Sequence, residues 1–142
     1  YDRNLTNVVA GVLSELGSER AFVVHGADGL DEITLTGPTR ISELNGGQVS
    51  TSEISPGDFG LEIISIEALA GGDATQNAQI LCDILDGKQG PQRDVVLLNA
   101  AAAIAAGGLA DDMAGGIEIA RDSIDSGRAR RALERLVEVS NT

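Results

Sequence analysis

The sequence has few aromatic residues, a single cysteine and no tryptophan, and each shortage limits what the chain can be. Aromatic residues make up 2% of the 142 residues, so we expect a core of Leu, Ile, Val and Ala, which suits helices packed closely on a sheet. Cys82 has no second cysteine with which to form an intrachain disulfide, and nothing else indicates an oxidising compartment. We therefore expect a cytoplasmic protein.

Basic side chains are also scarce. The chain has 10 Lys and Arg against 22 Asp and Glu, which gives a formal net charge of −12. Because nucleic-acid-binding proteins normally present a basic face, we expect no nucleic-acid partner. A phosphorylated small molecule is still compatible with this charge, since a bound divalent cation reverses the local sign of the electric field.

Long apolar runs are missing as well. The longest, residues 95–106, contains Asn99 and falls well short of the roughly 20 residues that cross a bilayer. No charged-then-apolar leader is visible, and we expect no membrane partner. The length fits one domain, and because the sequence starts with Tyr1 rather than Met, we expect a piece of a longer protein.

The apolar residues that are present indicate an α/β fold. Residues 21–24 form a continuously apolar run, which is typical of a strand that is covered on both faces in a parallel sheet. We therefore predict three layers, with a mainly parallel sheet flanked by helices and an added antiparallel hairpin. The pattern predicts helices that include residues 5–16, 80–85, 95–106, 109–124 and 129–137. It places the strand of this apolar run at 20–24, a second strand at 33–36, and a hairpin of 40–44 and 49–54 around Asn45-Gly46-Gly47.

The most informative stretch is residues 23–32, where an apolar run ends in a glycine-rich turn with three acidic residues. Gly26 and Gly29 permit a tight turn, because glycine has no barrier to positive φ. We expect Asp31 and Glu32 on the exposed rim, where oxygen ligands suit Mg²⁺, which is typically held by one or two carboxylates together with substrate phosphates and waters. The alternative is an ordinary surface turn, since Gly and Asp tolerate turn geometry.

For the remaining polar residues, structural roles are the better prediction. His25 and Cys82 are too far apart in sequence to indicate a zinc site. A glycine-rich helix start can bind an anion, but Asp73 is placed to cap that helix itself. We expect Asn99 to bond to a neighbouring loop, and the alternating Arg and Glu of residues 128–138 to form a solvated, salt-bridged face.

Seven sequence elements, in one order, resemble the C-terminal α/β part of the anthranilate phosphoribosyltransferase family over nearly the whole chain. They are residues 24–32, 37–39, 58–61, 71–74 with 77–78, 90–94, 97–102 and 124–127. The resemblance implies an incomplete catalytic domain of the nucleoside phosphorylase and phosphoribosyltransferase type. Residues 1–142 would be the C-terminal part of that domain, with the N-terminal helical domain and the diphosphate-loop region outside the chain.

The resemblance also implies a function in tryptophan biosynthesis, the transfer of phosphoribosyl from 5-phosphoribosyl diphosphate to the amine of anthranilate with Mg²⁺ as cofactor. The family's metal-binding acidic pair falls on Asp31 and Glu32, and no residue of this chain receives a catalytic role. The implied homodimer belongs to the complete protein, because the helical domain that makes the dimer contact is missing here. By itself we expect the chain to be inactive.

Two alternatives remain open. One is a phosphoribosyltransferase or nucleoside phosphorylase of the same fold that uses another acceptor, since a fold does not fix the substrate. The other is a non-catalytic domain that keeps the fold.

Overall fold

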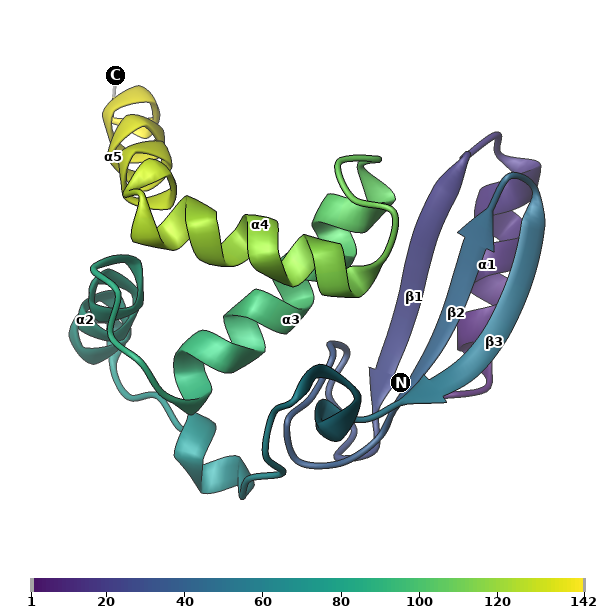
Figure 1. The fold of residues 1–142 in the computed structure, drawn as a ribbon, viewed down its shortest axis with the longest axis horizontal. Helices are drawn as coiled ribbons and strands as arrows, with labels where there is room; N and C mark the ends of the chain where they lie inside the picture. The colour runs from purple at the N-terminus through teal and green to yellow at the C-terminus, as the bar shows by residue number, and fades with distance from the viewer. Residues whose placement is uncertain (1, 142) are drawn as a thin grey trace.

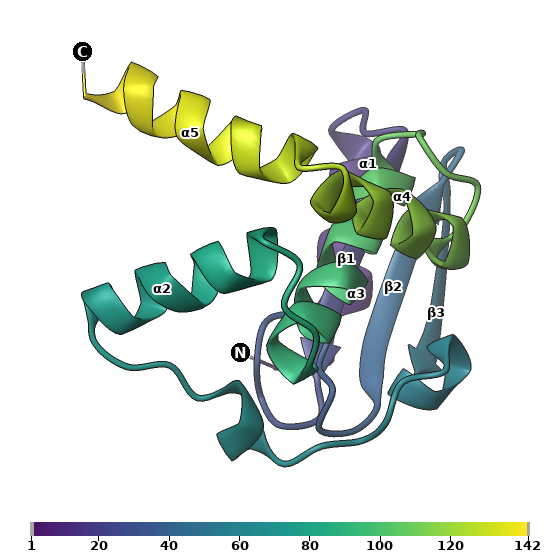
Figure 2. The same cartoon turned by 60° about the vertical axis from the view of Figure 1, so that its left-hand side comes forward.

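The structure is a computed structural model that describes residues 2–141, and it has three layers (Figure 1). A three-stranded sheet has α1 on one face and the pair α3 and α4 on the other, while α2 and α5 project from the far side of that pair (Figure 2). In chain order the elements are α1 (Leu5–Glu15), β1 (Arg20–Gly26), β2 (Thr39–Asn45), β3 (Gln48–Ile54), the short 3-10 helices η1 (Pro56–Phe59) and η2 (Ile66–Leu69), α2 (Ala74–Leu85), α3 (Pro91–Ala106), α4 (Met113–Asp125) and α5 (Arg128–Ser140).

The two faces of the sheet differ because side chains alternate along each strand. On one face, Val24 of β1 lies opposite Ile41 of β2, and both pack into a core that includes Leu98 of α3. On the other face, the buried Ser42 hydroxyl donates to the Thr6 hydroxyl of α1 over 3.0 Å. The sheet therefore has an apolar core on the side of α3 and a hydroxyl-lined contact on the side of α1.

The predicted hairpin is confirmed. β2 and β3 pair antiparallel from Thr39 opposite Ile54 to Asn45 opposite Gln48. The connecting Gly46 and Gly47 have φ values of +56° and +81°. A two-residue hairpin turn with positive φ at both positions matches the twist of the strands, which is why glycine is favoured there.

The sheet does not follow the prediction of a mainly parallel arrangement. Every strand pair within residues 2–141 is antiparallel, in the order β1-β2-β3. The apolar run in β1 correctly indicated a strand with cover on both faces, but cover says nothing about direction. The connection from β1 to β2 contains no helix, whereas neighbouring parallel strands require a crossover that is usually helical.

The predicted strand at residues 33–36 is also absent, and these residues form a buried loop. Thr34 is 1% exposed, and its N–H donates to the Thr39 hydroxyl over 3.1 Å. The N–H and C=O of Ile33 bond to the side chain of Asn99. Side chains therefore satisfy backbone groups that a strand would pair with a neighbouring strand.

α2 and α3 begin where the sequence predicts, whereas α4 begins at Met113 and leaves Leu109, a residue of the predicted helix, in the preceding loop. Asp73 caps α2 by accepting from the N–H of Gln76 at 2.9 Å, while the Gln76 side chain accepts from the N–H of Asp73 at 3.1 Å. Pro91 is the first residue of α3. The reciprocal bonds at the start of α2 confirm a capping box.

Within the described part of the chain, every helix is too short or too polar to cross a membrane.

A buried arginine joins the start of α3 to the end of α4. Arg93 is 2% exposed, and its guanidinium donates to the Asp125 carboxylate over 2.7 Å and to the Gly87 carbonyl over 3.1 Å. A buried cation needs such partners, because desolvating an unpaired charge is costly. This link fixes one end of the contact between α3 and α4.

The middle of that contact depends on a glycine. A Cβ added at Gly116 of α4 would lie 2.5 Å from the carbonyl oxygen of Ala101 in α3, and 2.9 Å from its Cα. Ala101 itself is fully buried. The two helices therefore approach more closely than a methyl group at residue 116 permits.

Some apolar surface stays uncovered. β1 has a neighbouring strand on one side only within residues 2–141. On α1, the side chains of Val8, Val12 and Leu16 are 57%, 52% and 77% exposed. The unpaired edge of β1 and this face of α1 are available for contact with further protein.

We expect Gly116→Ala to destabilise the fold by about 1–3 kcal/mol, the usual cost of forcing extra volume into a packed interior. Gly115→Ala is the matched control, because a Cβ there would lie 3.5 Å from its nearest neighbour and so fits without displacement. Alanine is also the better helix former by about 1 kcal/mol. Urea unfolding of both variants checks the prediction, and a Gly116→Ala variant as stable as Gly115→Ala would contradict it.

Candidate metal-binding turn

The predicted acidic turn directly follows β1 and is closed by its own backbone. The N–H of Gly26 donates to the carbonyl of Leu30 over 2.9 Å, and the N–H of Gly29 donates to the carbonyl of Gly26 over 3.0 Å. Gly29 has φ +91°, as expected for a glycine in a tight turn. Gly26 does not have a positive φ, and it is needed for a different reason: a Cβ there would lie 2.5 Å from the carboxylate of Asp28.

Asp28 points into the turn and holds it together. Its carboxylate accepts hydrogen bonds from the hydroxyls of Thr34 and Thr36, the latter over 2.7 Å, and from the N–H of Leu30 over 3.1 Å. Partial burial by itself raises the pKa of Asp28, but these hydrogen bonds together lower it below its ordinary value. This carboxylate therefore stays ionised and engaged within the turn.

Asn99, a residue of α3, binds the far end of the turn at Ile33. Its amide oxygen accepts from the N–H of Ile33 over 2.9 Å, and its amide nitrogen donates to the carbonyl of Ile33 over 2.9 Å. The same nitrogen also donates to the carbonyl of Val95 over 3.0 Å. The prediction that Asn99 bonds to a neighbouring loop is therefore confirmed, and that loop is the acidic turn.

Asp31 and Glu32 lie between these two attachments and are both exposed. Within residues 2–141, neither side chain takes part in a hydrogen bond or an ion pair. The three acidic residues of the turn thus divide into one that is engaged inside it and two that are free for an external ligand.

The two free carboxylates suit a hard cation and do not suit zinc. No group of three or more His, Cys, Asp and Glu side chains in the described part of the chain is placed to hold a metal ion. A pair of carboxylates is nevertheless the usual protein contribution to a Mg²⁺ site, because substrate phosphates and waters complete the octahedron. The donor set of Asp31 and Glu32 therefore fits Mg²⁺ bound together with a phosphorylated ligand.

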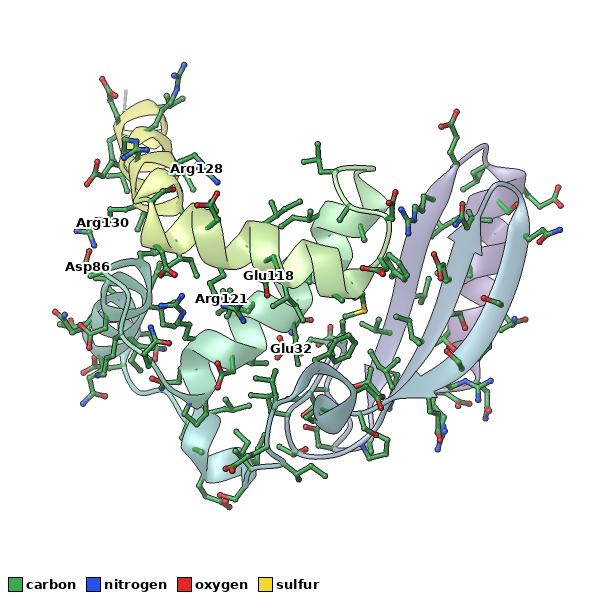
Figure 3. All side chains as sticks on the ribbon, in the orientation of Figure 1. Glu32, Asp86, Glu118, Arg121, Arg128 and Arg130 are labelled. Atoms are coloured by element: carbon green, nitrogen blue, oxygen red, sulfur yellow. The ribbon has the colours of Figure 1, made fainter. Side chains whose placement is uncertain are left out.

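Glu32 also lines an open, mostly apolar groove of about 660 Å³. Its walls come from η2, from Ile80 and Ile84 of α2 and from Val95 of α3. Figure 3 shows Glu32 beside α3, away from Asp86, Arg128 and Arg130 at the end where α2 and α5 lie. The acidic turn thus borders a space large enough for a small molecule.

The other candidate residues have the structural roles expected of them. Arg130 of α5 pairs with Glu134 and with Asp86, and Arg128 pairs with Asp122, so the last helix carries a salt-bridged face as predicted (Figure 3). Cys82 is a half-buried free cysteine on α2.

Thr34 and Thr36 organise the turn but are not among the predicted site residues. Their alternation with Ile33 and Leu35 predicts a strand, whereas both hydroxyls donate to Asp28. The available signal was a pair of threonines, two residues apart, shortly after an aspartate in a glycine-rich turn. Ser and Thr hydroxyls in such loops commonly bond to nearby acceptors instead of entering a ladder.

Fold and turn together define an α/β domain with a candidate divalent-cation site at the end of its first strand. Residues 1–130 match the model of the glycosyl transferase family, a/b domain. The chain therefore belongs to this glycosyl transferase family.

Two curated relatives carry the same name. The chain is 51% identical over 142 residues to the anthranilate phosphoribosyltransferase of Nitrosomonas europaea, and 49% identical over 142 residues to that of a Bradyrhizobium species. These matches cover 99% and 100% of the chain but 41% and 42% of the relatives. The chain thus spans about two fifths of the length of the curated relatives it matches.

Solved structures give the same result. A crystal structure of anthranilate phosphoribosyltransferase from Thermus thermophilus superposes with a TM-score of 0.89 at 33% identity, over 100% of this chain and 42% of that one. The Saccharomyces cerevisiae enzyme in complex with PRPP and Mg superposes with a TM-score of 0.87 at 29% identity, with the same coverage.

We expect Asp28→Asn to lower the thermal stability of the protein at neutral pH, because the charged acceptor of Thr34 and Thr36 is lost. Since folding lowers the pKa of Asp28, the stability that its ionised carboxylate gives to the fold is fully present above the ordinary carboxyl pKa of about 4. This contribution is lost as the pH falls through the lower pKa that Asp28 has in the folded state.

The difference in midpoint temperature between wild type and Asp28→Asn should therefore be constant at neutral pH and shrink below about pH 4. Thermal unfolding followed by circular dichroism between neutral and acidic pH measures it. Asp31→Asn, in the same turn, is the matched control and should leave the midpoint unchanged. A difference that grows as the pH falls would show that the ionised form of Asp28 does not stabilise the turn.

Proposed function

We propose that residues 1–142 are the C-terminal part of the α/β domain of an anthranilate phosphoribosyltransferase. The complete protein transfers phosphoribosyl from 5-phosphoribosyl diphosphate to the amine of anthranilate, a step of tryptophan biosynthesis. The observation that carries the proposal is the free Asp31 and Glu32 pair on a turn fixed at both ends, in a chain 51% identical to an enzyme of that name. The relatives' greater length supports the view that the chain is one part of the whole.

In this proposal Asp31 and Glu32 would hold Mg²⁺. An ion held there together with the diphosphate would supply positive charge against the negative charge that develops on the leaving group. The two carboxylates would be available for that function, because the hydroxyls of Thr34 and Thr36 and the N–H of Leu30 donate to Asp28 instead.

The reaction assigns no covalent role to this chain. The bond between ribose C1 and the diphosphate oxygen breaks, the anthranilate nitrogen bonds to that carbon, and the nitrogen loses a proton. No protein nucleophile is needed, so neither Cys82 nor a serine is assigned a covalent role.

The remaining features of the proposal concern the complete protein. We infer that the unpaired edge of β1 receives a parallel strand from the rest of that protein and that its additional residues cover the exposed apolar face of α1. The complete protein is a cytoplasmic homodimer that binds neither nucleic acid nor membranes. The net charge of −12 supports the absence of a nucleic-acid partner.

The chain of residues 1–142 alone should not catalyse the transfer. Charge neutralisation at the acidic turn supplies only part of what the reaction needs, because both substrates must also be positioned. The loss of anthranilate fluorescence with 5-phosphoribosyl diphosphate and Mg²⁺ measures turnover, with the complete protein as the positive control. Robust turnover by residues 1–142 would contradict the proposed division between this chain and the rest.

In the complete protein, Asp31→Asn and Glu32→Gln should each raise the Mg²⁺ concentration for half-maximal activity by at least about tenfold, since even residues that only support metal ligands typically contribute that much. Glu62→Gln, an exposed carboxylate between η1 and η2, is the matched control and should leave it unchanged. Steady-state rates over a Mg²⁺ titration provide the measurement.

The same preparations separate the alternatives. Turnover of a nucleoside with phosphate, but not of anthranilate, would identify a nucleoside phosphorylase of the same fold. The absence of all turnover in the complete protein would indicate a non-catalytic domain.

A further inference from the structure

The geometry around Asp31 and Glu32 assigns a further role to Asn99. Leu30, the residue before the pair, is held at both backbone groups: its N–H donates to Asp28 and its C=O accepts from Gly26. Ile33, the residue after the pair, is also held at both backbone groups, in this case by the Asn99 amide. Asp31 and Glu32 are therefore a two-residue span whose ends are both fixed.

The two attachments differ in origin. Leu30 is held from within the turn, whereas Ile33 is held by a side chain of α3 that lies 66 residues away in sequence. The side chain of Ile33 is 2% exposed and packs in the same core as Leu98, the residue before Asn99. Through Asn99, the position of Glu32 is thus tied to the buried helix of the domain.

An asparagine in the interior of a mostly apolar helix needs such an explanation. Asparagine is a weaker helix former than alanine or leucine, because its side chain competes for backbone hydrogen bonds. In α3 it follows Leu97 and Leu98, which are 4% and 1% exposed, and all of its described bonds go to Ile33 and to Val95. The bond to Val95 fixes the orientation of the amide, and the two to Ile33 transmit that orientation to the turn.

We propose that Asn99 is a positioning residue for the metal-binding pair Asp31 and Glu32, an inference that rests on the proposed function. Asn99 touches neither metal nor substrate and acts through the backbone of Ile33. Residues that orient metal ligands typically change metal affinity or activity by about 10–100-fold when they are replaced. The effect of Asn99 should appear in the Mg²⁺ dependence of the protein and not only in its stability.

The test uses the complete protein with Asn99→Leu, which keeps the size and removes the hydrogen bonds, and with Asn99→Ala, which avoids overpacking if the leucine variant folds poorly. Both should raise the Mg²⁺ concentration for half-maximal activity by about tenfold. Calorimetric binding of 5-phosphoribosyl diphosphate gives a readout independent of turnover. The Mg²⁺-dependent gain in affinity should fall by a similar factor, while binding without Mg²⁺ stays unchanged.

Asp125→Asn is the matched control, because it weakens the link between Arg93 at the start of α3 and α4 and leaves the turn untouched. It should lower the unfolding midpoint without moving the Mg²⁺ half-saturation. If Asn99→Leu and Asn99→Ala behave like Asp125→Asn while Asp31→Asn shifts the half-saturation, Asn99 is merely structural and the inference is wrong. If Asp31→Asn and Glu32→Gln shift nothing, the metal assignment itself fails, and the role of Asn99 fails with it.

Discussion

The burial of α3 between the sheet and α4 is the constraint on which the rest of the structure depends. One side of this helix packs on the sheet through Leu98, and another side meets α4 where Ala101 faces Gly116. A helix enclosed on several sides must carry small residues wherever a neighbour comes close, which explains the buried Ala101, Ala102 and Ala105 in its second half. The same enclosure makes α3 a fixed reference for the loop that it touches.

The carboxylates of that loop have two different roles. Asp28, Asp31 and Glu32 lie within five positions of one another and are all acidic. Asp28 accepts hydrogen bonds from the hydroxyls of Thr34 and Thr36 and from the N–H of Leu30, and these bonds stabilise the turn. Because no such donors are left for Asp31 and Glu32, their charge stays directed outward. One acidic residue therefore stabilises the turn, and the other two are available to bind a ligand at its rim.

Local signals in the sequence were sufficient for much of this fold. The hairpin turn at Gly46 and Gly47, the cap at Asp73 and the helix start at Pro91 all depend on residues a few positions apart, and all three were predicted. Strand direction could not be predicted in the same way. An apolar run indicates that both faces of a strand are buried, but it does not indicate which strand lies beside it or in which direction that strand runs.

Partners outside any strand ladder explain the other differences. Residues 33–36 alternate as a strand does, but Ile33 bonds to the side chain of Asn99, 66 residues away, and the N–H of Thr34 donates to the side chain of Thr39 in the same loop region. In the turn, the sequence indicated that Asp31 and Glu32 are exposed. It gave no role for Asp28, because that role depends on hydroxyls that the loop folds back toward the carboxylate.

The sequence distance between Ile33 and Asn99 has a consequence for how the site comes into being. During synthesis, the acidic turn leaves the ribosome well before α3 does, so both carboxylates exist in the nascent chain before they have a defined separation. Only when α3 has been made and has docked is the second end of the span anchored. The fixed spacing of Asp31 and Glu32, the pair proposed to hold the cation, therefore arises late in the folding of this chain, after α3 has docked.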